Sequence, residues 1–63
     1  MNFILAKNDK QIGTCLRMLF PEQKRFTINP VMNDQGKMEY HVYVDLDDER
    51  FEYYQRKYNT LIS

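Results

Sequence analysis

The stretch from Arg25 to Leu46 reads RFTINPVMNDQGKMEYHVYVDL and carries the clearest structural signals in the chain. Its second half, residues 37–46, alternates between two sets of side chains, which is typical of a strand with one buried face. One face would carry Met38, Tyr40, Val42, Val44 and Leu46, and the other Glu39, His41, Tyr43 and Asp45. We therefore predict a strand over 37–46 whose apolar face packs on a core.

A second strand is predicted just before it, over residues 25–32. Phe26, Ile28 and Met32 would share one face, and Thr27, Asn29 and Val31 the other. The intervening Asn33-Asp34-Gln35-Gly36 predicts a hairpin turn, because Gly36 can adopt the positive φ that such a turn requires. Pro30 has no N–H to give to a ladder, so this strand is expected at an edge of the sheet.

Working outward, residues 1–6 predict a short apolar strand, and a helix follows it. Asn8 or Asp9 is a candidate N-cap, with Gln11 placed for a capping box and Pro21 expected to close the helix. A second helix is predicted after Asp45, Asp47 or Asp48. The expected core stripe of the first helix is Ile12, Cys15, Leu16 and Leu19, and that of the second is Phe51, Tyr54, Tyr58, Leu61 and Ile62.

The predicted order βαββα indicates an α+β fold, with residues 1–63 as a single domain. A crossover through the first helix makes strands one and two parallel, and the hairpin makes strand three antiparallel to both. The compact solution is a three-stranded sheet in order 1-3-2 with both helices packed on one face. This would be a truncated ferredoxin-like plait without its fourth strand, which leaves the strand over 1–6 as an uncovered apolar edge.

Composition narrows the classes of function. Nine basic and nine acidic residues give a net charge of zero, so the chain lacks the broad positive field that drives non-specific phosphate binding. A single cysteine excludes an internal disulfide. The sequence has no cluster of His and Cys residues that could bind zinc. We expect no cofactor. We also expect no membrane association, because the apolar run over 3–6 is too short for a signal peptide or a membrane span. The expected location is the cytoplasm, the cell's own or a host's.

Candidate chemistry is sparse. A nucleophilic pair would need Cys15 and His41, which are the only residues of their types, yet the predicted sheet lies between them. Helix capping accounts for the acidic group Asp45, Asp47, Asp48, Glu49 and Glu52 without a metal ion, and a docking spot for a basic partner is the next interpretation. We therefore expect no catalytic site and no metal site.

The sequence favours a small, non-enzymatic regulator or inhibitor that binds a larger protein stoichiometrically. A domain this small has marginal stability of its own, which favours association. Chains of this size are common among phage and mobile-element proteins, including inhibitors of host nucleases and CRISPR systems (anti-CRISPR proteins). The candidate partner-binding residues are Ile4 and Ala6 at the edge, Glu39, His41 and Tyr43 on the open sheet face, and Tyr53, Arg56 and Lys57 on the second helix.

Several alternatives stay open. The chain is a nucleic-acid-binding protein if His41 and Tyr43 stack on bases while Lys24, Arg25 and Lys37 contact phosphates, although the neutral net charge disfavours this. A homodimer through paired edges of the first strand is compatible with either function. Gly13 lies inside the first helix at a cost of about 1 kcal/mol relative to Ala, so either a close contact requires it or the protein tolerates the loss.

Overall fold

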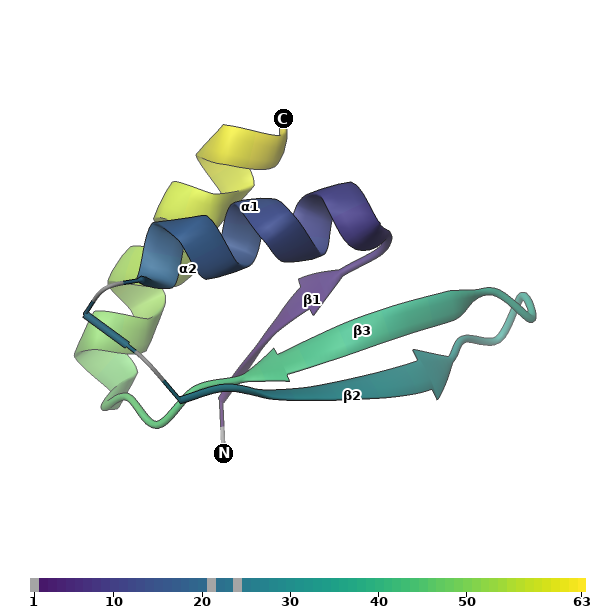
Figure 1. Cartoon of the computed structure of the whole chain (residues 1–63), viewed down its shortest axis with the longest axis horizontal. Helices are drawn as coiled ribbons and strands as arrows, with labels where there is room; N and C mark the ends of the chain where they lie inside the picture. The colour runs from purple at the N-terminus through teal and green to yellow at the C-terminus, as the bar shows by residue number, and fades with distance from the viewer. Residues whose placement is uncertain (1, 21, 24) are drawn as a thin grey trace.

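A computed structural model describes residues 2–20, 22–23 and 25–63. The elements are β1 (Phe3–Ala6), α1 (Asp9–Leu19), β2 (Thr27–Met32), β3 (Met38–Tyr43) and α2 (Asp48–Ile62). The strands form a sheet in the order β1-β3-β2, and β3 is antiparallel to both of its neighbours (Figure 1). The predicted α+β fold, its βαββα order and its 1-3-2 sheet are therefore confirmed. The arrangement corresponds to a ferredoxin-like plait without the fourth strand.

The core lies between one face of the sheet and the two helices. Its buried members are Ile4, Val42 and Val44 from the sheet side, Cys15 and Leu19 from α1, and Tyr54 and Tyr58 from α2. Because side chains alternate along a strand, the residues between these core positions lie on the opposite face. Both helices lie on the same side of the sheet, as predicted, and no helix among the described residues covers the other side (Figure 1).

The start of α1 is fixed by side-chain contacts at its N-terminus. Asn8 is the N-cap, and its Oδ1 accepts a hydrogen bond from the Gln11 N–H at 2.9 Å. The Gln11 Oε1 in turn accepts from the Lys7 N–H at 2.8 Å, one residue earlier than a standard capping box requires. The Lys7 N–H, directly after the end of β1, is therefore already hydrogen-bonded to a side chain of α1. The predicted closing role of Pro21 lies outside the described residues.

The β2–β3 hairpin forms as predicted. The Asn33 N–H donates to the Lys37 carbonyl at 2.8 Å, and Asn33 Oδ1 accepts from the N–H groups of Gln35 and Lys37 at 2.9 Å each. Gly36 has a φ of 77°, in the left-handed region that favours glycine. The positive φ predicted for Gly36 is therefore present in the turn that joins β2 to β3.

Strand β3 is shorter than expected, because it ends at Tyr43 instead of continuing to residue 46. The Val44 N–H still donates to the Asn2 carbonyl at 3.4 Å, but the chain then turns toward α2. Asp47 caps α2, with its Oδ1 accepting from the Arg50 N–H at 2.8 Å. Residues 44–46, which the alternating pattern assigned to the strand, instead form the connection to this cap.

The end of α2 is a second departure from the prediction. Tyr54 and Tyr58 are buried as expected, whereas Leu61 and Ile62 are 53% and 38% exposed. The 15-residue α2 is longer than the 11-residue α1, and its C-terminal end extends past the neighbouring helix (Figure 1). These two residues therefore continue the apolar stripe and line a shallow hollow beside the start of α1, but they are not buried there.

Neither helix, over the residues described, has the length and apolar character needed to cross a membrane.

Candidate functional site

The open face of the sheet carries three aromatic rings, Phe3 from β1 and His41 and Tyr43 from β3, which we call the aromatic cluster. The Phe3 and His41 rings are stacked, with centroids 4.0 Å apart and planes 7° apart. Tyr43 lies 5.3 Å from Phe3 with a tilted ring, and 6.2 Å from His41 edge-on. The three rings therefore pack on one another outside the core of the protein.

The strand register produces this cluster. Phe3 lies opposite Tyr43, and Leu5 lies opposite His41, so Phe3 is a diagonal neighbour of His41 on the same face. A tilted aromatic pair such as Phe3–Tyr43 contributes about 1 kcal/mol beyond the area it buries. Phe3 is nevertheless 37% exposed. The cluster is thus ordered by its own contacts and still accessible.

The rest of this face is small or neutral, with one carboxylate. Register places Thr27 opposite Tyr43, Asn29 opposite His41 and Val31 opposite Glu39. The outward set predicted from the sequence is confirmed: Thr27, Asn29, Val31, Glu39, His41 and Tyr43. Phe3 and Leu5 complete it from β1.

Ile4 and Ala6, predicted to contact a partner, are fully buried in the monomer, so a partner would not reach their side chains. Their side chains point into the core. The Val44 N–H donates to the Asn2 carbonyl, so Asn2 and Val44 form a hydrogen-bonded pair. Because bonded and non-bonded pairs alternate along an antiparallel ladder, Ile4–Val42 and Ala6–Tyr40 are bonded pairs as well. Ile4 and Ala6 thus fall at positions whose main-chain groups face β3, whereas those of Phe3 and Leu5 face away from it.

Tyr53, Arg56 and Lys57 form a separate surface on α2. The Tyr53 side chain is 60% exposed, and the Lys57 Nζ lies 6.0 Å from the centre of its ring. Arg56 pairs with Glu52 one helical turn earlier. The predicted partner-binding residues therefore divide between the sheet face and this helix, and they do not form one continuous site.

The nucleic-acid alternative is brought together only in part: His41 packs beside Tyr43, and Arg25 lines a hollow with Tyr43, whereas Lys37 lies apart. Arg25 precedes β2 at the end where Tyr43 lies, and Lys37 follows the turn at the other end. Those ends are separated by a strand of about 17 Å. One ring face of His41 is occupied by Phe3, which leaves a single face for a base. Lys24 lies outside the described residues.

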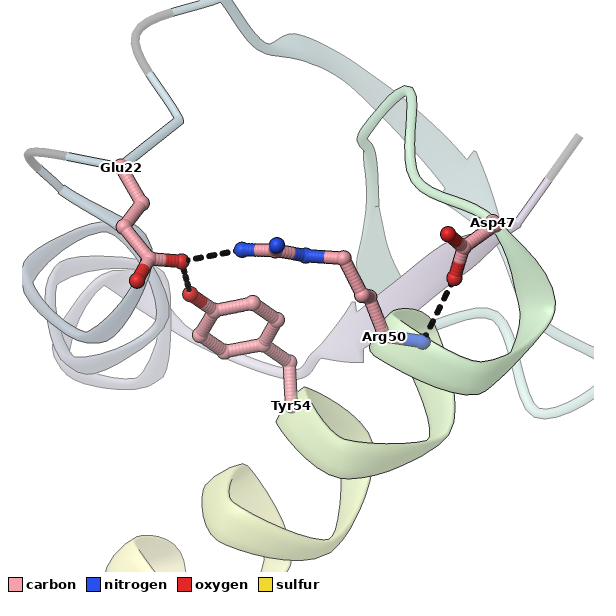
Figure 2. Close-up of polar contacts among 4 residues, drawn as sticks. All are labelled: Glu22, Asp47, Arg50 and Tyr54. Carbon is pink, nitrogen blue, oxygen red and sulfur yellow. Dashed lines mark hydrogen bonds and ion pairs between the residues drawn. The ribbon is translucent and has the colours of Figure 1, made fainter.

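A polar cluster joins the α1–β2 connection to α2. The Glu22 carboxylate accepts from the Arg50 guanidinium at 2.6 Å and from the Tyr54 hydroxyl, both through Oε2 (Figure 2). The Tyr54 hydrogen bond, aided by Arg50, holds the pKa of Glu22 below its ordinary value. The same bond raises the pKa of Tyr54. Sequence reasoning missed this cluster because Glu22 lies in a connection without periodicity.

Cys15 lies in the core, as predicted. Burial raises the pKa of its thiol to about 11, so the sulfur stays protonated at neutral pH. His41 lies on the far face of the sheet, where its ring stacks on Phe3. No group of three Asp, Glu, His or Cys side chains suited to a metal ion occurs in the part of the chain that the structure describes.

No known protein family matches the chain, and neither the curated proteins nor the solved structures contain a match.

Proposed function

We propose that this chain is a small non-enzymatic protein that binds a larger protein stoichiometrically and thereby regulates or inhibits it. The observation that carries the proposal is the aromatic cluster of Phe3, His41 and Tyr43 on the sheet face that no helix covers. Candidate targets are host nucleases and CRISPR effector complexes, with the chain itself encoded by a phage or mobile element and acting in the cytoplasm.

The physical support is that a protein partner gains most from rigid, partly exposed aromatic anchors. Binding energy at interfaces concentrates in a few such side chains, tyrosine prominent among them, surrounded by neutral contacts that exclude water. The Phe3–His41 stack holds the rings in place before a partner arrives, which lowers the entropy lost on binding. Thr27, Asn29 and Glu39 supply a polar rim on the same face.

Affinity capture tests this proposal with a matched pair of tyrosine variants. Immobilised wild-type chain is exposed to purified candidate nucleases and CRISPR effectors, and to a lysate with mass spectrometry and nucleic-acid detection on one eluate. For the protein that binds, Tyr43→Ala should weaken affinity about 30-fold, the effect of losing a 2 kcal/mol anchor. Tyr53→Ala, on α2, should bind as wild type does.

Two results would contradict the proposal. In the first, Tyr53→Ala loses the target while Tyr43→Ala retains it, which would place the contact on α2. In the second, only nucleic acid elutes and does so with steep salt dependence, which would favour the nucleic-acid alternative. Circular dichroism melts of both variants verify that each one is folded.

A further inference from the structure

The two edges of the sheet differ in their capacity to pair with another strand. At the β1 edge, the main-chain groups of Phe3 and Leu5 face away from β3, as the Asn2–Val44 bond and ladder alternation require. The strand Phe3–Ala6 has no charge, no proline and no bulge. Charges, prolines and bulges are among the devices that block edge pairing in natural proteins, and β1 has none of these three, although it is short at four residues.

The β2 edge is blocked at its centre. The Asn33 N–H bonds to the Lys37 carbonyl, so alternation makes Pro30–Tyr40 a non-bonded pair. The main-chain groups of Pro30 therefore face outward, and proline has no N–H to offer there. Of the two edges, only β1 presents an unbroken run of donors and acceptors.

We propose that β1 pairs with β1 of a second copy of this chain, antiparallel across a two-fold axis at Ile4. In this register Phe3 lies opposite Leu5 of the other copy, and each bonds through both of its outward main-chain groups. A shift of two residues would pair Phe3 with Lys7, whose N–H already donates to Gln11 Oε1. In the register centred on Ile4, every outward main-chain group of Phe3 and Leu5 finds a partner.

A second copy fits this edge better than an unrelated strand because the resulting assembly is closed. Each chain has one competent edge, and pairing removes both at once. The product is a six-stranded sheet in the order β2-β3-β1-β1-β3-β2 with Pro30 at either end, so growth stops at two copies. The net charge of zero leaves no overall repulsion between copies.

The size of the paired surface sets the strength of the dimer. Two four-residue strands bury much less than the roughly 1,200 Å² of a standard stable interface. The dimer should therefore be concentration-dependent, forming between micromolar levels and about 1 mM.

Wild-type chain gives the first test. Sedimentation should show the mass doubling across that concentration range. Amide exchange followed by NMR should slow about tenfold at Phe3 and Leu5 as the dimer forms, while Val42, already inside the monomer's ladder, should not change. A monomer at the highest concentration, with Phe3 and Leu5 exchanging at one rate throughout, overturns the proposal.

A matched pair of proline variants gives the second test. Leu5→Pro and Met32→Pro each delete one outward N–H, from the β1 edge and the β2 edge respectively. Leu5→Pro should abolish the dimer, and Met32→Pro should retain it. Equal loss in both overturns the proposal. If Leu5→Pro fails to fold, Leu5→Lys, which places a charge in each copy beside the axis, should give a folded monomer. A folded Leu5→Lys dimer contradicts the pairing.

Discussion

At the scale of single residues, the tyrosines show how position decides what a side chain does. Tyr58 is buried against α1, and burial raises the pKa of its hydroxyl. Tyr54 is buried too, but its hydroxyl reaches the Glu22 carboxylate. Tyr43 and Tyr53 are more exposed, one on the open sheet face and the other on α2. Only the strand register and the helix packing distinguish these four roles.

Gly13 has no structural requirement for glycine. Its φ is not positive, and an added Cβ would lie 3.1 Å from Arg17 Nη1, the mobile end of a long side chain. Gly13→Ala should therefore raise the free energy of unfolding by about 0.5–1 kcal/mol, measured by urea denaturation. Gly36→Ala is the control and should lower it by about 1 kcal/mol, because φ there is positive. A loss of stability in Gly13→Ala would contradict this account.

Two of the three rings of the aromatic cluster could be predicted from the sequence. His41 and Tyr43 lie on the polar side of an alternating strand, so their outward direction follows from a period of two. Phe3 was not predicted, because β1 is apolar almost throughout and shows no alternation. Its place beside His41 depends on the register between strands distant in sequence.

At the scale of elements, local signals were sufficient wherever a turn or a cap defined a boundary. Asn8 and Asp47 are caps that the sequence offered among two and three candidates, and Gly36 has the positive φ that its turn predicted. Boundaries set by tertiary packing were missed, at the end of β3 and in the last turn of α2. The apolar periodicity continues through residues 44–46 and through Leu61 and Ile62. Whether another helix or strand packs on these residues depends on how long the neighbouring elements are.

The contact between Glu22 and α2 should make stability depend on pH. The pKa of Glu22 is lowered in the folded state from an ordinary value of 4.5. The charged carboxylate therefore stabilises the protein above pH 4.5, and this stabilisation is lost as pH falls through the folded-state pKa. Wild type should melt slightly above Glu22→Gln at neutral pH, and the difference should shrink in acid. The exposure of the pair keeps the effect small. A difference that stays constant down to acid unfolding would contradict this assignment.

At the scale of the whole molecule, the sheet has one face committed to the core and one face free. The core takes Ile4 and Val42 from the strands, together with both helices. The free face carries the aromatic cluster, and the free β1 edge adjoins it through Phe3. The two proposals therefore use adjacent but different groups: side chains on the face for a larger protein, and main-chain groups on the edge for a second copy.

The proposed function depends on His41 and Phe3 stacking on the side of the sheet opposite the helices. Nuclear Overhauser effects from the ring protons of His41 test it most directly, in the wild-type chain and without a partner. The structure predicts strong effects between His41 and Phe3, weaker ones to Tyr43, and none to the side chains of α1 or α2. Effects from His41 to Cys15 or Leu19 would place the ring in the core and contradict the account.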